Sequence, residues 1–166
     1  MITLVLGGTR SGKSEVAEAL AARVGAEAVT YVATGTATDD DMAGRIAAHR
    51  ARRPSGWSTV EAGRDLPAVL RDVVGVVLVD SLGTWLAGDP ALVPDAAGLC
   101  AALQGRRGDT VVVSEEVGLG VHAETAVGRR FADGLGALNR AVADVADRVL
   151  LVVAGRILPL ERDIAL

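Results

Sequence analysis

Aromatic residues are nearly absent from this sequence, which has one Tyr, one Phe and two Trp among its 166 residues. Half of the residues are nevertheless hydrophobic, so the core has to be built from Val, Leu, Ile and Ala. A chain of this length is the size of one domain and long enough to bury a sizeable core. We therefore expect a single domain over residues 1–166.

Other absences exclude whole classes of protein. Cys100 is the only cysteine, so no internal disulfide can form, which fits a reducing compartment. No uninterrupted apolar stretch approaches a membrane span, and the first residues lack the charged segment and apolar core of a signal peptide. A net charge of −4 argues against a general nucleic-acid binder. We expect a soluble, cytoplasmic protein with no nucleic-acid partner.

The apolar runs are continuous rather than alternating, as in residues 73–80 (VVGVVLVD) and 110–114 (TVVVS). Such runs are typical of parallel strands covered on both faces. Strand-like and helix-like segments alternate, which predicts βαβ units. Strands are expected at 2–6, 28–33, 73–80, 110–114 and 148–153, with an edge strand at 58–61, and helices at 13–24, 39–52, 66–71, 95–104 and 126–147. The expected fold is α/β, with a mostly parallel central sheet flanked by helices.

The most informative feature present is a glycine-rich loop between the first strand and the first helix. It fits G-x-x-x-x-G-K-[ST], the loop that wraps nucleotide phosphates. Its glycines let backbone N–H groups turn toward an anion, while Lys13 can reach the β- and γ-phosphates and the Ser14 hydroxyl can ligate Mg²⁺. The alternative is a strand–helix turn that binds nothing. The residues of the loop are Gly7, Gly8, Thr9, Arg10, Ser11, Gly12, Lys13 and Ser14.

Two carboxylates follow buried strands, at the edge where an open α/β sheet binds its ligands. Asp80 ends the run VVLVD, where a nucleotide-binding sheet commonly places a carboxylate for Mg²⁺; the alternative is a cap on the next segment. Glu116, in SEEVGLG, is a candidate for the substrate loop as a base or as a holder of the metal's water. A charged surface turn is the alternative there.

A basic stretch surrounds His49. At helical spacing Arg45, His49 and either Arg52 or Arg53 share one face. Neighbouring cations disfavour the protonated imidazole and keep a nitrogen lone pair available, so His49 is a candidate covalent nucleophile on phosphorus. A solvated basic helix face is the competing interpretation. His122 has no such neighbours and is interpreted as a loop residue.

Together these residues resemble one family across nearly the whole chain, the bifunctional adenosylcobinamide kinase/adenosylcobinamide-phosphate guanylyltransferases of cobalamin biosynthesis. The most specific part is D-D-x-M-x-x-R-I-x-x-H-R-x-x-R-P from Asp39 to Pro54. The other matching segments are GGTRSGKS at 7–14, YVAT at 31–34, W-x-T-x-E at 57–61, V-D-S-L-x-x-W-L at 79–86, E-V-G-L-G at 116–120 and R-R-F-A-D-x-L-G-x-L-N-R at 129–140.

The resemblance implies two activities. One is phosphorylation of the aminopropanol hydroxyl of adenosylcobinamide, and the other is transfer of GMP from GTP to that phosphate through a GMP-histidine intermediate on the residue matching His49. It implies a RecA-like P-loop NTPase fold, a homotrimer, a corrinoid substrate, and GTP, with ATP as another possible phosphoryl donor. By resemblance the nucleotide contacts are the loop residues 7–14 together with Val32, Ala33, Thr34, Arg50, Ala51, Arg52, Arg53 and Glu61.

The chain also departs from the family pattern. Gly83 stands where the family usually has Thr, Glu115 where Asn is common, and Ala123 where Pro is common. Two other functions stay open at the level of sequence. A different small-molecule P-loop kinase would use the arginines after His49 as a lid, and a RecA-like regulatory NTPase would signal to a protein partner.

Overall fold

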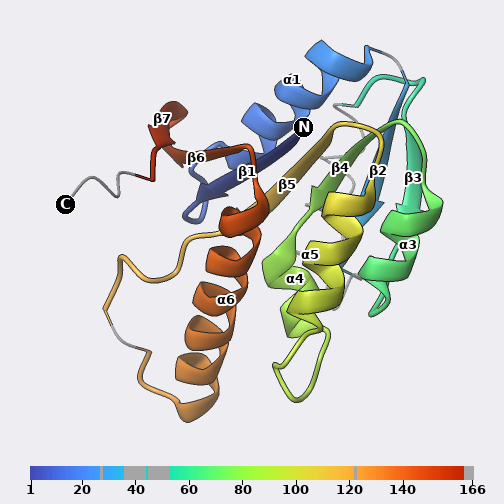
Figure 1. The fold of residues 1–166 in the computed structure, drawn as a ribbon. Helices are drawn as coiled ribbons and strands as arrows, with labels where there is room; N and C mark the ends of the chain where they lie inside the picture. Colours follow the sequence, from blue (N-terminus) through green and yellow to red (C-terminus); the bar gives the residue numbers. More distant parts are fainter. Residues whose placement is uncertain (27, 36–43, 45–52, 122, 163–166) are drawn as a thin grey trace.

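The computed structural model describes the chain except for residues 27, 36–43, 45–52, 122 and 163–166. The strands of the described part are β1 (Ile2–Gly7), β2 (Val29–Ala33), β3 (Ser58–Glu61), β4 (Val76–Asp80), β5 (Thr110–Glu115), β6 (Arg148–Val153) and β7 (Arg156–Leu160). Its helices are α1 (Lys13–Gly25), α3 (Leu66–Asp72), α4 (Leu82–Ala87), α5 (Ala96–Gly105) and α6 (Ala126–Val145). Figure 1 shows them as one sheet with helices on both faces.

The sheet has the order β3-β2-β4-β5-β1-β6-β7. All neighbouring pairs are parallel except β6 and β7, which form an antiparallel pair. Because the strands from β3 to β6 run the same way, the loops that follow β1, β2, β4 and β5 gather at one edge. The expected α/β fold with a mostly parallel sheet is confirmed.

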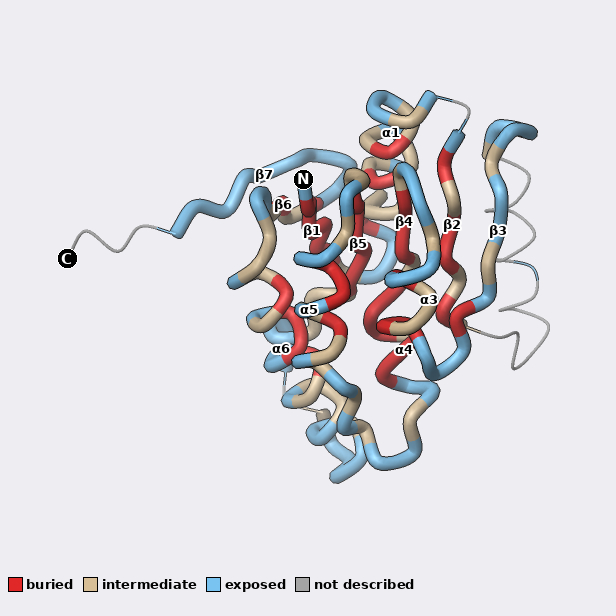
Figure 2. Tube along the Cα trace, turned by 45° about the vertical axis from the view of Figure 1, so that its right-hand side comes forward, coloured by how far each residue is buried: buried red, intermediate tan, exposed pale blue. Residues whose placement is uncertain are grey.

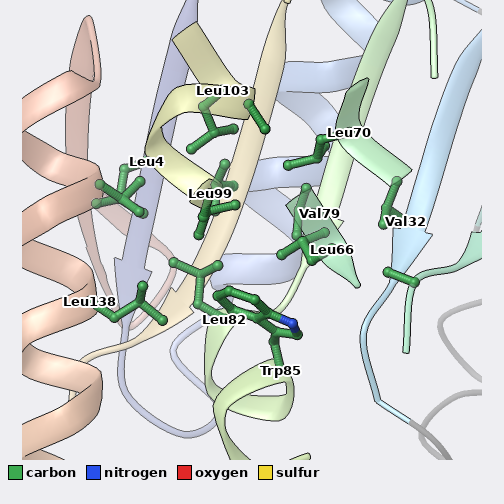
Figure 3. Packing of buried hydrophobic residues seen from close by; sticks show 14 of the residues in the cluster. Leu4, Val32, Leu66, Leu70, Val79, Leu82, Trp85, Leu99, Leu103 and Leu138 are labelled. Atoms are coloured by element: carbon green, nitrogen blue, oxygen red, sulfur yellow. The ribbon is translucent and has the colours of Figure 1, made fainter. Parts of the chain in front are cut away.

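The core lies on both faces of the sheet, which explains why the strand runs are apolar without alternation. In β4, Val77 and Val79 belong to the cluster under α3, α4, α5 and α6, whereas Leu78 belongs to the cluster under α1. Figure 3 shows the first cluster, where Leu82 and Trp85 meet leucines of the other helices over the sheet. Figure 2 shows the central strands as buried and β7 as exposed along its length.

The structure adds two elements to those expected and shortens one. No helix was expected between 73–80 and 95–104, but α4 forms there with Ser81 as its N-cap in a reciprocal capping box with Thr84. The expected strand 73–80 begins only at Val76, because Val73 caps α3 and Gly75 has a φ of 78°. No strand was expected after 148–153, but β7 forms there after a turn with positive φ at Ala154 and Gly155.

The remaining strands and helices of the described part lie within a residue or two of their expected bounds. The expected helix 39–52 falls almost entirely outside the described residues. None of the helices described is both long and apolar enough to cross a membrane.

Candidate nucleotide site

The glycine-rich loop has the geometry of a phosphate cradle. It leaves β1 at Gly7 and enters α1 at Lys13, with Gly12 at the N-cap in the left-handed conformation (φ 92°) that suits glycine. Ser11 N donates to Gly8 O at 3.3 Å, which closes the turn. Side chains larger than hydrogen are excluded at Gly7, since a Cβ there would lie 2.9 Å from Val152 O and overlap the Ser11 hydroxyl.

The turn between β6 and β7 packs against this loop. Gly155 N donates to Ser11 O at 2.8 Å, and a Cβ on Gly12 would lie 3.4 Å from the Cα of Gly155. The sequence analysis missed this contact. The sequence carried only a weak signal for it, a glycine at position 155 shortly after the apolar run 148–153.

Lys13 is one of two cations in the loop, and its side chain, unlike that of the exposed Arg10, is largely buried. Its Nζ donates to Gly8 O at 3.4 Å and lies 3.7 Å from Glu115 Oε1, with 13% of the side chain exposed. The ammonium therefore lies across the loop, where a phosphate bound to the backbone N–H groups would meet it.

Glu115 is held from several sides. Its carboxylate accepts hydrogen bonds from Ser81 Oγ at 3.0 Å and from Gly83 N at 3.1 Å. Its backbone carbonyl accepts from Asn139 Nδ2 at 3.0 Å, and Asn139 Oδ1 in turn accepts from the buried Ser114 hydroxyl at 2.5 Å. These bonds fix the end of β5 between α4, α6 and the phosphate loop.

The ends of β2 and β4 are joined by hydroxyl groups. Thr34 Oγ1 accepts from Ser81 N at 2.9 Å, donates to Ser81 O at 2.6 Å and lies 2.6 Å from Thr84 Oγ1. The Asp80–Ser81 peptide, which connects β4 to α4, is cis. Thr34 thus uses its side chain to hold two strand ends together.

A tyrosine connects the carboxylate of β4 with an arginine beyond β2. Tyr31 Oη donates to Asp80 Oδ2 at 2.9 Å, and the Arg53 guanidinium lies over the Tyr31 ring, 3.2 Å from its centroid. Burial, and then the negative charge of Asp80, raise the pKa of Tyr31 far above its ordinary value. Tyr31 therefore stays neutral and keeps its proton on the side of Asp80.

Comparison with known proteins identifies the family. Residues 3–160 match the family described as cobinamide kinase / cobinamide phosphate guanyltransferase. The chain is 43% identical to the bifunctional adenosylcobalamin biosynthesis protein CobP of Pseudomonas aeruginosa, over 97% of this chain and 98% of that protein. It belongs to this family. It is also 36% identical to the bifunctional adenosylcobalamin biosynthesis protein CobU of Escherichia coli, over 93% of this chain and 97% of that protein.

A solved structure supports the fold of this family member. The flagellar accessory protein FlaH of Methanocaldococcus jannaschii superimposes with a TM-score of 0.50 and 13% identity, over 94% of this chain and 74% of that chain. At this identity the likeness concerns the fold alone. The expected α/β fold and the resemblance to the family are both confirmed.

The described part of this family member brings many predicted site residues to one edge of the sheet. The phosphate loop, Asp80 and Glu61 all lie at the carboxyl ends of parallel strands. Val32 is fully buried between β3 and β4, so none of its atoms is accessible to a nucleotide in this structure. The Thr34 hydroxyl is engaged within the protein, in bonds to Ser81. The predicted residues His49, Arg50, Ala51 and Arg52 lie outside the described residues, as do Arg45 and His122.

Of the two adjacent glutamates, the structure places Glu115 rather than Glu116 against the phosphate loop. Glu116 N donates to Gly7 O at 3.1 Å, but its carboxylate accepts from Gly118 N at 2.6 Å within its own turn. The sequence analysis singled out Glu116 as a base or a holder of the metal's water. It could not determine which glutamate faced the loop, because successive side chains of a strand point to opposite faces.

The donor set fits a magnesium ion of the kind that nucleotides bring. Mg²⁺ is usually held by one or two carboxylates together with waters and substrate phosphates, and a hydroxyl and a carboxylate are available in Ser14 and Asp80. Groups of three or more His, Cys, Asp and Glu side chains able to hold a metal are absent from the part of the chain that the structure describes. An ion that shares its coordination with phosphates does not require such a group.

Proposed function

We propose that the chain phosphorylates adenosylcobinamide and then transfers GMP from GTP to adenosylcobinamide phosphate, giving adenosylcobinamide-GDP and pyrophosphate in cobalamin biosynthesis. The observation that carries the proposal is the phosphate cradle of residues 7–14, formed in a chain that matches the family over residues 3–160. A cradle with its lysine suits phosphoryl transfer, because such catalysis is mostly positioning and charge stabilisation.

In the kinase step the backbone N–H groups of the loop bind the phosphates, and Lys13 neutralises charge on the β- and γ-phosphates. The substrate hydroxyl oxygen bonds to the γ-phosphorus, the bond to the leaving nucleoside diphosphate breaks, and the hydroxyl proton is released. Ser14 and Asp80 would hold Mg²⁺, which would offset the negative charge that develops on the phosphates. GTP or ATP is the proposed phosphoryl donor.

In the guanylyl step a nitrogen of His49 bonds to the α-phosphorus of GTP, and pyrophosphate leaves with the electrons of the broken P–O bond. An oxygen of the substrate's phosphate then bonds to the same phosphorus and displaces His49. Covalent catalysis divides one reaction between two anions into two steps, and pyrophosphate can depart while GMP stays on the protein.

The nucleotide would contact residues 7–14, 33, 34, 50–53 and 61, with Glu116 on the side of the corrinoid. Arg53 is already oriented by the Tyr31 ring, which supports a place for it beside the nucleotide. The proposed assembly is a homotrimer in the cytoplasm.

Intact mass measurement after incubation with GTP tests this function without the corrinoid. We expect the chain to gain the mass of one GMP residue, and the His49→Ala variant to gain none. Phosphorylation of adenosylcobinamide should survive in that variant, because the kinase step does not use His49. A His49→Ala protein that retains full guanylyl transfer would contradict the proposal.

A further inference from the structure

Glu115 lies beside the first residue of the phosphate loop. It ends β5 and is in register with Gly7, where β1 passes into the loop. The side chain is about one third exposed, at 29%. A carboxylate in this position adds negative charge to a site that binds phosphates, so its presence requires a physical reason.

The carboxylate is fixed by a built set of donors on α4. Ser81 Oγ lies 3.0 Å from both carboxylate oxygens, and Gly83 N donates to Oε2 at 3.1 Å. Charge-assisted bonds to a carboxylate are stronger than neutral ones. Glu115 is therefore held in one orientation and is not a freely rotating surface group.

Gly83 is what makes room for this orientation. A Cβ at position 83 would overlap Glu115 Oε2 and lie 2.9 Å from its Cδ. Positions 83 and 115 are also two of the three at which the sequence departs from the family pattern, and the structure places them in contact. The glycine and the glutamate act as a pair.

The partner that remains for the carboxylate is the loop lysine. Lys13 Nζ lies 3.7 Å from Glu115 Oε1, an ion pair longer than a hydrogen bond, and its bond to Gly8 O is long at 3.4 Å. Both contacts are weak compared with the short bonds an ammonium makes to phosphate oxygens. The arrangement keeps Lys13 in place and leaves it easy to release.

We propose that Glu115 is a positioning residue of the nucleotide site. It holds the Lys13 ammonium over the loop, the β- and γ-phosphates of a nucleoside triphosphate replace it as the partner of that ammonium, and Gly83 permits the pairing of Glu115 with Lys13. The inference rests only on the nucleotide-binding part of the proposed function. It implies that, when a triphosphate binds, Lys13 exchanges the Glu115 carboxylate for the β- and γ-phosphates. Nucleoside monophosphates do not require this exchange, because Lys13 reaches only the β- and γ-phosphates.

Calorimetric titration of the full chain with GTP and with GMP, with Mg²⁺ and with EDTA, tests the exchange. Glu115→Gln keeps the size of the side chain and one acceptor oxygen for the Gly83 amide, but removes the charge. We expect it to bind GTP about three- to tenfold more tightly in both buffers, and GMP within about twofold of the wild type. Asp144→Asn makes the same change in charge on the exposed surface of α6 and should leave the ratio of GTP to GMP affinity unchanged.

A double-mutant cycle tests the role of Gly83. Gly83→Ala pushes the carboxylate away and should tighten GTP binding in the wild-type background, but should have no further effect beside Glu115→Ala, where the atoms it would meet are missing. Thermal unfolding of each variant reports whether it is folded.

Three results would overturn the proposal. The first is a ratio of GTP to GMP affinity that is unchanged or lowered in Glu115→Gln. The second is a loss of GTP affinity in this variant only when Mg²⁺ is present, which would assign Glu115 to the metal's ligands. The third is a wild-type chain that binds no GTP. Failure of the chain to act on corrinoids would contradict the proposed function and leave these binding results standing.

Discussion

Single hydroxyl groups have large effects at the edge of this sheet, because they bond to backbone groups that have little access to water. Thr34 is the clearest case, since its side chain accepts from the amide of buried Ser81 and donates to the carbonyl of the same residue. A buried backbone group that loses its partner costs more than the bond itself contributed. The stability of this end of the sheet is therefore sensitive even to substitutions that conserve the shape of a side chain.

Thr34→Val keeps the shape of the side chain and removes these bonds. We expect the free energy of unfolding to fall by about 1 kcal/mol, because Ser81 N and O each lose one hydrogen bond and keep their bonds to Thr84 Oγ1, and Ser81 O also keeps the bond from Trp85 N. Urea denaturation measures the change. Thr59→Val, on an exposed position of β3, is the matched control and should stay within about 0.5 kcal/mol of the wild type. Equal losses in the two variants would contradict the role of Thr34.

Tyr31 is the only tyrosine of the chain, so an ultraviolet titration reports on it alone. Burial and Asp80 raise its pKa in the folded state, so the folded protein should show no tyrosinate absorbance until it unfolds. The unfolded chain loses this proton near pH 10. The stability that depends on neutral Tyr31 is therefore fully present below about pH 10 and lost as the pH rises further.

Comparison of Tyr31→Phe with the wild type isolates this contribution. The difference between their unfolding free energies should be constant below about pH 10 and shrink above it. Tyrosinate absorbance near pH 10 in a folded sample would show that the ring is accessible and would contradict the prediction.

At the scale of elements, Arg106 joins the end of α5 to the segment between α3 and β4. Its guanidinium donates to Leu70 O at 2.9 Å, to Val73 O at 2.5 Å and to Gly75 O at 2.7 Å, while Nε donates to Thr110 Oγ1 at 3.0 Å. Burial lowers the pKa of Arg106, although a guanidinium keeps its charge at any pH of use. One planar side chain thus satisfies three carbonyls at the edge opposite the nucleotide site.

Arg106→Lys should lower the free energy of unfolding by about 2 kcal/mol, because an ammonium cannot match the planar fork of donors. The neighbouring Arg107 is exposed, so Arg107→Lys is the control and should change stability by less than about 0.5 kcal/mol. Chemical denaturation distinguishes the two, and guanylyl transfer should survive in both because they lie away from the phosphate loop.

The elements also show what could be predicted from sequence. Long apolar strands and their intervening helices were predictable, because continuous Val and Leu runs and helical spacing carry strong signals. The helix α4 was not, since its signal is a short capping box at Ser81 and Thr84 inside a glycine-containing stretch. The strand β7 was missed because Pro159 argues against a strand and is tolerated at a sheet edge.

For the site, the phosphate loop was predictable because its chemistry lies in consecutive residues. The pairing of Glu115 with Gly83 and Lys13 was not, because it joins three elements at once. The hydrogen bond from Gly155 N to Ser11 O also joins segments that are far apart in the sequence. Sequence reasoning reaches groups that share a segment, whereas contacts between segments depend on the register of the sheet.

At the scale of the whole molecule, the surface of β7 is unusually apolar for an exposed strand. Ile157, Leu158 and Leu160 are 50%, 57% and 40% exposed, and Val153 at the end of β6 is 58% exposed. Figure 2 shows this strand lying along the outside of the molecule. Exposed apolar patches of this kind mark contact surfaces.

We expect sedimentation equilibrium to show a trimer, and Leu158→Asp to shift the population to smaller species, because a charge cannot be buried in an apolar contact without a partner. Val74, between α3 and β4, is also exposed, so Val74→Asp is the control and should leave the mass of the assembly unchanged. A wild-type chain that sediments as a monomer and is fully active would refute a site shared between subunits.

The position of β1 in the interior of the sheet has a consequence for biosynthesis. This strand is made first among the strands, yet both of its neighbours in the sheet, β5 and β6, belong to much later segments. A nascent chain on the ribosome therefore carries the nucleotide-binding motif long before that motif has any neighbouring strands. Guanine nucleotides should be unable to assist early folding, and the motif becomes a receptor only when translation has passed the hairpin of β6 and β7.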